Sequence, residues 1–283
     1  MIRNTTAFGL SALLLAGSAG AANVTWNGSA ADGAWENGAN WSAGAAPVLD
    51  GTDNGFISNG DTVTYTPGPD LVVNAGSTLT IDGGSTWQQG PTNWTQINGG
   101  ALVLDDGTLT RSGGGNLVLA FNDGDDATVS LDNGSSINLG GELWFGHTAA
   151  LTNQVISLTI GGGSSISATT PGAVGLWFWD TDAAGNDFNL NFISGTEVSS
   201  INARVGRRNT AGGSNAVTWE TLWDEGILTV DGGNAGSFSD HFTTTGTAGT
   251  SDYALLSNPV PEPGSLALLG LGGLLIARRR RAE

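Results

Sequence analysis

The chain of 283 residues contains no cysteine and no lysine, and its only histidines are His147 and His241. Without cysteine there is no disulfide, no thiolate nucleophile and no thiolate-bound metal. Without lysine there is neither a Schiff-base site nor a Walker-type phosphate loop. Two histidines so far apart in sequence form no two-histidine metal motif. No familiar catalytic motif remains, and we predict that the protein is not an enzyme.

Positive charge is also scarce. The chain has nine basic and 26 acidic residues, and five of the arginines lie at its two ends. The segment 22–263 keeps four basic and 25 acidic residues, a net charge of −21. Such a charge repels phosphate backbones, so the sequence argues against nucleic acid as a partner. Most of the acids are aspartates beside glycine or asparagine, a pattern typical of solvated turns.

Two acidic stretches contain enough clustered oxygens to be considered as Ca²⁺ sites. They read DGTDNG over 50–55 and DGDD over 123–126. Neither has the EF-hand pattern, which needs glycine at the sixth and glutamate at the twelfth position of the loop. We therefore interpret both as turns and keep Ca²⁺ as the alternative. No metal ligands and no other cofactor are predicted.

The N-terminus has the pattern of a secretory signal peptide. Arg3 precedes an apolar stretch over 7–16, and Ala19, Gly20 and Ala21 supply the small residues that a signal peptidase needs. We predict a signal peptide over 1–21, with cleavage after Ala21 or Ala22.

The C-terminal segment 260–283 has three parts. It begins with Val260, Pro261, Glu262 and Pro263, continues with a 13-residue apolar run over 265–277, and ends with Arg278, Arg279, Arg280 and Arg281 before the last two residues. The prolines favour an extended, accessible segment. The apolar run is shorter than the roughly 20 residues of a comfortable transmembrane helix, and the arginines hold its end at the cytoplasmic side. The pattern predicts transient membrane insertion.

This tail resembles a PEP-CTERM sorting signal, the three-part C-terminus that exosortase-type membrane enzymes recognise in Gram-negative bacteria. The resemblance implies cleavage near Pro261, Glu262 and Pro263. It also implies that the upstream part is released or transferred to the cell surface or the exopolysaccharide matrix. Because the chain would be the substrate of that enzyme, the resemblance assigns it no catalytic residue.

Between the two signals, short apolar segments recur. Six apolar-x-apolar segments, each followed by a glycine-containing turn, end at Ile81, Leu104, Leu131, Ile160, Phe192 and Val230. The spacings are 23, 27, 29, 32 and 38 residues, and most of the chain lacks helical periodicity. The middle copies divide into three short strands each, as in one coil of a β-helix. We predict an all-β, right-handed parallel β-helix (β-solenoid); a β-sandwich is the alternative.

Both ends of such a stack need covering. We predict an N-terminal cap and first strands over 22–75, and repeats with a C-terminal cap over 76–258. The cap contains Trp26, Trp35 and Trp41, and its pattern VTWNG…GAWENGANWSAGAAP resembles the start of bacterial surface proteins with autotransporter-type β-strand repeats.

A single-faced helix is predicted over 217–225, near the C-terminal end of the repeats. Trp219, Leu222 and Trp223 lie at i, i+3 and i+4, and Gly226 ends the helix.

The third strand of each coil suggests a binding face. Aligning 117–120, 143–146, 176–179 and 203–206 puts Val118, Trp144, Trp177 and Arg204 in one outward column. Trp144 and Trp177 would then form an exposed aromatic ladder beside Arg204, a surface on which sugar rings dock. Alternatively, the two tryptophans only stabilise the sheet by stacking, or lie under a loop.

Together these features predict an exported surface or extracellular-matrix protein with a structural or adhesive role, associated with exopolysaccharide. A polysaccharide-acting enzyme on a β-helix scaffold is the alternative. Its candidate polar residues are Asp180, Arg204, Arg207 and Arg208.

Overall fold

The computed structural model describes residues 20–66, 68–90, 92–148, 151–168, 174–181, 183–208, 214–247 and 253–258. The predicted sorting tail lies outside these ranges, as does the predicted signal peptide apart from its last two residues. Within these ranges, no helix is long and apolar enough to cross a membrane.

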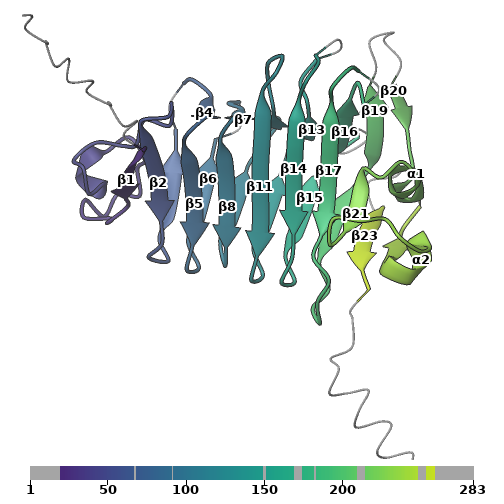
Figure 1. Cartoon of the computed structure of the whole chain (residues 1–283). Coiled ribbons are helices and arrows are strands. Elements are labelled where there is room, and N and C mark those ends of the chain that lie inside the picture. The colour runs from purple at the N-terminus through teal and green to yellow at the C-terminus, as the bar shows by residue number, and fades with distance from the viewer. Residues whose placement is uncertain are drawn as a thin grey trace, which may run out of the picture.

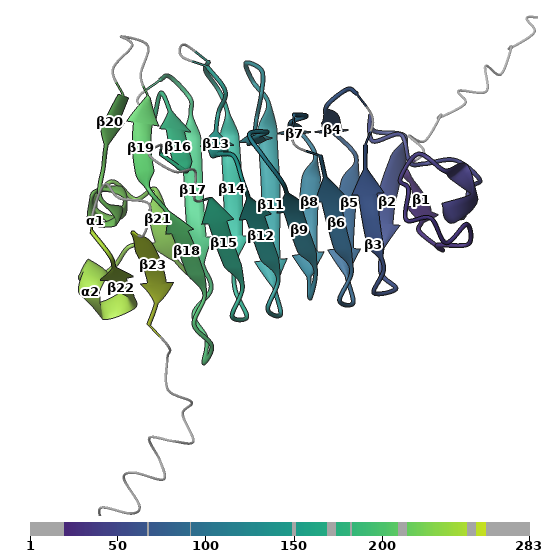
Figure 2. The same cartoon turned by 180° about the vertical axis from the view of Figure 1, so that it is seen from behind.

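The described chain consists mainly of three sheets whose strands stack along one axis (Figures 1 and 2). The first sheet contains, in spatial order, β1 (Ala22–Thr25), β2 (Asp53–Ile57), β5 (Thr78–Asp82), β8 (Ala101–Asp105), β11 (Asp126–Asp132), β14 (Val155–Ile160), β17 (Asp187–Phe192) and β21 (Leu228–Val230). The second contains β20 (Ser214–Ala216), β19 (Val205–Arg208), β16 (Leu176–Trp179), β13 (Leu143–Phe145), β10 (Leu117–Leu119), β7 (Thr95–Asn98) and β4 (Leu71–Asn74). The third contains β22 (Phe242–Thr245), β23 (Ala254–Ser257), β18 (Ser200–Ala203), β15 (Ser165–Ala168), β12 (Ser136–Leu139), β9 (Thr108–Arg111), β6 (Thr86–Gln89) and β3 (Thr62–Tyr65).

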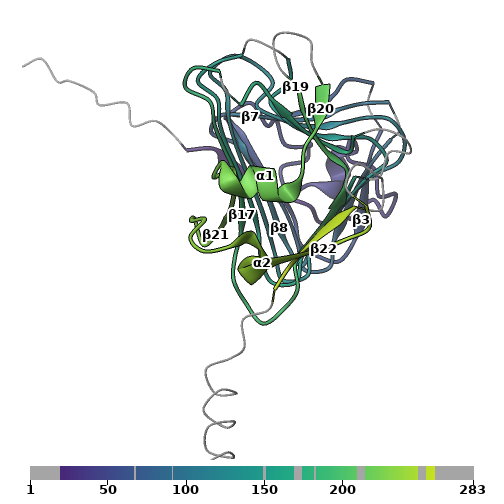
Figure 3. The same ribbon diagram turned by 90° about the vertical axis from the view of Figure 1, so that its right-hand side faces the viewer.

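The chain visits the three sheets in turn, so that most strands pair in parallel with the strand three positions later. Three strands thus make one coil, and the view along the axis shows the three sheets enclosing a common interior (Figure 3). Among the named strands, antiparallel pairing is confined to β20, β22 and β23. The fold is a parallel β-helix, in agreement with the prediction and not with the β-sandwich alternative.

The register confirms the repeat found in the sequence. All six predicted segment ends face one another across successive coils of the first sheet: Ile81, Leu104, Leu131, Ile160, Phe192 and Val230. One further coil precedes them, because Ile57 of β2 pairs with Ile81 of β5. The six-copy repeat did not include this coil.

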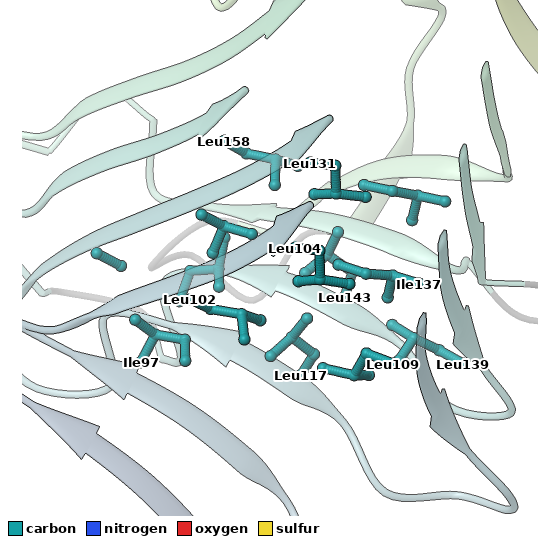
Figure 4. Packing of buried hydrophobic residues seen from close by; sticks show 14 of the residues in the cluster. Ile97, Leu102, Leu104, Leu109, Leu117, Leu131, Ile137, Leu139, Leu143 and Leu158 are labelled. Atoms are coloured by element: carbon teal, nitrogen blue, oxygen red, sulfur yellow. The ribbon is translucent and has the colours of Figure 1, made fainter. Parts of the chain in front are cut away.

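The interior is filled by the inward-facing residues of each strand. Burial alternates along the strands, as in β11, where Ala127, Val129 and Leu131 are buried between more exposed neighbours. Figure 4 shows the resulting contacts among Leu102, Leu104, Leu109, Leu117, Ile137 and Leu143, which come from all three sheets. Each such side chain contributes about 1.5–3 kcal/mol when fully buried, so stacking stabilises strands that are too short to persist alone.

Tryptophans gather at the N-terminal end of the stack. Trp35 and Trp41 lie edge-to-face at 4.8 Å, and Trp26 contacts Trp41 at 5.2 Å. The Trp41 indole donates a hydrogen bond of 2.8 Å to the carbonyl oxygen of Trp35. The short 3₁₀ helix η1 (Gly38–Asn40) lies in the same segment.

The helix α1 (Trp219–Asp224) lies at the opposite end of the stack, across its axis in Figure 3. Thr218 caps its N-terminus by accepting a hydrogen bond from the Thr221 amide, and Gly226 follows it with φ of 74°. Trp219, Leu222 and Trp223 are buried, so the predicted single-faced helix is confirmed. A second short helix, α2 (Phe238–His241), precedes β22.

Three aspartates form a column at the ends of β5, β8 and β11, where Asp82, Asp105 and Asp132 face one another. Burial, together with the charge of Asp105, raises the pKa of the Asp82 carboxyl. Because the pKa of Asp82 is higher in the folded state than in the unfolded state, its charged form destabilises the fold. The free energy of unfolding therefore increases as the pH falls through the folded-state pKa.

We therefore expect Asp82→Asn to raise the melting temperature at about pH 7, and to have little effect below the unfolded-state pKa of about 3.9. Asp50→Asn serves as the comparison, because hydrogen bonds from Thr52 lower the pKa of Asp50. Its carboxylate stabilises the fold above the unfolded-state pKa, so its replacement should lower the melting temperature at neutral pH. Thermal unfolding at several pH values measures the change in melting temperature of both variants. A change of the same sign in both at neutral pH would contradict the opposite pKa shifts of Asp82 and Asp50.

Candidate functional site

The candidate site lies on the outward face of the second sheet. As predicted, Leu117, Leu143 and Leu176 face one another, which puts Val118, Trp144 and Trp177 in one outward column. The fourth segment of the predicted alignment is wrong by two residues. Residues 205–208, and not 203–206, pair with 176–179.

The error has a simple physical reason. Side chains alternate with a period of two along a strand, so a slip of two residues preserves the inward and outward pattern and cannot be detected from it. Arg204 lies between β18 and β19, where its carbonyl oxygen accepts hydrogen bonds from the amides of Gly175 and Leu176. Gly206 takes the place opposite Trp177, and a Cβ atom there would lie 2.7 Å from the Trp177 ring. Arg204 is therefore not part of the column.

The predicted exposure of the two tryptophans is also wrong. Trp144 is 9% and Trp177 5% exposed, and both pack with Val118 and Val174 in a second apolar cluster outside the interior of the β-helix. The cluster exists because other rings cover the column. Alternation along the strand identifies the outward residues but gives no information on what covers them.

Four further rings surround this cluster and are partly exposed. Trp94 precedes β7, Phe121 follows β10, His147 follows β13, and Trp179 is the last residue of β16. We call the six residues Trp94, Phe121, Trp144, His147, Trp177 and Trp179 the aromatic band. The sequence signal for the added members is an aromatic ring next to, or at the end of, a second-sheet strand.

Five rings of the aromatic band are linked by ring contacts, and Trp177 packs with Trp144 in the apolar cluster. Phe121 and His147 stack with ring centroids 3.8 Å apart and an interplanar angle of 16°. Trp144 contacts Trp94 at 5.3 Å and Trp179 at 5.6 Å. Since neighbouring strands lie about 4.8 Å apart, the band from β7 to β16 extends over roughly 15 Å along the stack.

Arg208 closes the band at its C-terminal side. Its guanidinium lies 4.1 Å from the ring centroid of Trp177, 4.8 Å from that of Trp179 and 5.6 Å from that of Trp144. These are cation–π distances. Arg208 thus occupies the role beside Trp177 that the sequence assigned to Arg204.

Two carboxylates accept hydrogen bonds from residues in or beside the band. Glu142 accepts a hydrogen bond of 2.6 Å from the Trp144 indole. Asp70 accepts one from the Trp94 amide at 2.7 Å and one from the Gln96 side chain at 2.9 Å. Burial lowers the pKa of His147, so its ring is uncharged at neutral pH and presents a flat stacking face.

The polar residues nominated for catalysis are not brought together on one surface. Arg207 faces away from Arg208 and forms an ion pair with Glu225, directly after α1. Asp180 is buried, and its amide donates to the carbonyl oxygen of Arg208. Arg204 lies at the corner described above.

The two candidate Ca²⁺ stretches are held by hydrogen bonds. Asp50 accepts from the hydroxyl and amide of Thr52, and Asp123 from the amide and hydroxyl of Thr152. These bonds lower the pKa of both carboxyls. Within the described ranges, no group of three or more histidine, aspartate or glutamate side chains is arranged to hold a metal ion.

A polar cavity of about 390 Å³ lies between the start of β17 and the chain that follows α1. Its lining includes the carboxylates of Asp187 and Glu225, together with Thr181 and Asn186. Since Glu225 is paired with Arg207, one of the two carboxylates is already neutralised.

The comparison with protein families gives one result. Residues 259–281 match the PEP-CTERM protein-sorting motif. The match confirms the resemblance drawn from the tail, and it covers only that tail. A PEP-CTERM motif implies that a protein is exported, sorted to the cell surface and processed by an exosortase membrane enzyme. No curated protein and no solved structure matched the chain.

Proposed function

We propose that the protein is a non-enzymatic component of the cell surface or extracellular matrix that binds exopolysaccharide through the aromatic band. The motif over 259–281 supports export, and the aromatic band is the observation that supports binding. Signal peptidase acts at the N-terminal signal in this proposal, and an exosortase-type enzyme acts at the tail after transient membrane insertion. The resemblance to repeat-containing bacterial surface proteins is consistent with this role.

The surface chemistry of the band favours a sugar ligand. Flat, partly exposed rings provide apolar faces, while Glu142, Asp70 and Arg208 provide hydrogen-bonding groups at their edges. Apolar rings with a few placed polar groups are the usual lining of small-molecule sites. A polymer lying along the stack would meet one strand about every 4.8 Å, so the site suits a linear chain better than a single small molecule.

We also propose that the β-helix is right-handed and that both of its ends are capped. The Trp26, Trp35 and Trp41 segment and the helix α1 would act as caps. Covered ends prevent the terminal strands from recruiting strands of other chains.

The polar cavity is the observation that favours the alternative, a polysaccharide-acting enzyme. Paired carboxylates can act as general acid and base only when their pKa values differ and both face the substrate. The ion pair between Glu225 and Arg207 opposes such a role. Release of reducing ends from the producer's exopolysaccharide by the purified protein, abolished by Asp187→Asn, would establish the enzyme instead.

We expect the double variant Trp94→Ala/Trp179→Ala to retain about ten-fold less of the producer's immobilised exopolysaccharide than the unmodified mature protein. These two rings are partly exposed, so their loss removes stacking area without opening the interior. Binding is measured by titration on the immobilised polymer, with circular dichroism to verify the fold.

Phe56→Ala is the matched control. Phe56 is a partly buried ring on β2 of the first sheet, away from the aromatic band. The control should bind like the unmodified protein. Equal losses in both variants, or no loss in the double variant, would contradict the proposed site.

A further inference from the structure

We infer that the aromatic band selects glycans that carry carboxylate groups, and that Arg208 binds the carboxylate. This inference rests on the proposed glycan-binding function of the band and specifies its ligand. It is carried by the distribution of positive charge, by the hydrogen-bond donors around Trp177, and by the position of the Arg208 guanidinium.

Positive charge on the mature segment is limited to four arginines, and their positions differ sharply. Arg111 is 2% exposed in the interior, where it donates to Thr95 and to the carbonyl oxygen of Asn116. Arg207 pairs with Glu225. Arg204 lies at the corner between β18 and β19. Within the described ranges, Arg208 forms no ion pair, and its partly exposed side chain places the guanidinium against tryptophan rings.

Hydrogen-bond donors exceed acceptors at this end of the band. The indole N–H groups of Trp177 and Trp179 are buried, and neither has an acceptor in the described part of the chain. Buried donors without acceptors are rare in folded proteins, and each one calls for an explanation. The carboxylates of Glu142 and Asp70, by contrast, already accept bonds from Trp144 and from the Gln96 side chain. An acceptor-rich ligand group would meet the Arg208 guanidinium here, because the two indole N–H groups are buried.

The stacked guanidinium is suited to a carboxylate. The central carbon of the Arg208 guanidinium lies 4.1 Å from the Trp177 centroid. A guanidinium that stacks flat on an aromatic ring keeps its in-plane N–H donors for another partner. A carboxylate accepts two parallel bonds from such a fork, which a hydroxyl group does not. A sugar ring that lies on the exposed face of Trp179 would bring a carboxylate substituent close to these donors.

The overall negative charge of the protein works against binding of an acidic glycan. The mature segment carries a net charge of −21, which opposes the approach of any polyanion. At physiological salt this repulsion is screened beyond about 8 Å, whereas the contact with Arg208 is short. Preference for an acidic glycan must therefore come from Arg208, and the preference should reverse when its charge is removed.

The experiment compares binding of polygalacturonate with binding of the same polymer after methyl esterification of its carboxyl groups. The mature protein should bind the acidic form about ten-fold or more tightly than the ester. Arg208→Gln should bind the ester as before and the acidic form more weakly than the ester. Arg207→Gln is the matched control: it makes the same change of charge one residue earlier, on the opposite face of β19, and should keep the preference.

Two results would overturn the inference. One is equal binding of both polymers by the unmodified protein; the other is the same loss of preference in Arg207→Gln and Arg208→Gln. If exopolysaccharide is still retained and Trp94→Ala/Trp179→Ala still loses it, the proposed function stands and only the carboxylate selectivity fails. If the unmodified protein does not retain the producer's exopolysaccharide, both the proposed function and the carboxylate selectivity are wrong.

Discussion

A chain that ends at Thr247 is expected to lose several kcal/mol of its free energy of unfolding, whereas a chain that ends at Asn258 should lose none. The strand β23 is inserted between β22 and β18 and pairs with both. Leu255 on this strand is fully buried and Tyr253 just before it is 6% exposed. Burial of two such side chains contributes about 1.5–3 kcal/mol each, against a total stability of about 5–15 kcal/mol for a typical domain.

Deletion of β23 also removes the partner of β22. In the described sheet, β22 pairs only with β23, so β22 and the preceding α2 would lose their attachment to the stack. Urea denaturation followed by circular dichroism compares the two truncated chains with the full mature protein. Equal midpoints for the chains ending at Thr247 and Asn258 would contradict the assigned role of β23.

The described part of the chain ends directly before the sorting motif. Asn258 is still held by the fold: its amide donates to the His241 carbonyl oxygen at 2.7 Å, and its side chain donates to that of Ser239 at 3.1 Å. The PEP-CTERM match begins at the next residue, 259. Cleavage near Pro261, Glu262 and Pro263 would therefore remove the tail and leave every described strand in place.

The sequence was sufficient to predict the stack. Each coil must place an apolar residue at the same inward position, and this constraint leaves a visible repeat even where the spacing varies from 23 to 38 residues per coil. The segment 53–74 escaped the repeat because β2 reads DNGFI, with glycine where later coils have leucine. The structure shows that Leu79 partly fills this space, since a Cβ atom on Gly55 would lie 3.2 Å from it.

The candidate site was predictable only in part. The pairing of Trp144 with Trp177 on adjacent strands followed from the alignment of their segments. The sequence did not predict that Arg208, and not Arg204, lies beside the tryptophans, because a two-residue slip leaves the alternation of side chains unchanged. The burial of Trp144 depends on rings at strand ends, such as Trp94 and His147, whose positions are set by turns that carry no periodic signal.

The turn between β8 and β9 gives the other large expected effect. From Leu104 to Leu109 the chain takes five steps, whereas the equivalent paths from Ile81 to Trp87 and from Leu131 to Ile137 take six. The neighbouring coils have a buried serine, Ser85 or Ser135, at the position that Gly107 occupies in the shorter turn. A Cβ atom on Gly107 would lie far inside contact distance of the Ile81 carbonyl oxygen on the preceding coil.

We expect Gly107→Ala to lower the free energy of unfolding by about 1–3 kcal/mol or more, because the added carbon meets backbone that can move only if the two coils separate. Gly114→Ala is the matched control. Gly114 is exposed, a Cβ atom added to it would have no other atom within 4 Å, and its φ is outside the left-handed region. Restricting the unfolded chain at such a site stabilises by about 0.4–1 kcal/mol. Urea denaturation of the two variants should therefore shift the midpoint in opposite directions, and a loss no larger in Gly107→Ala than in Gly114→Ala would show that the coils tolerate a side chain at this turn.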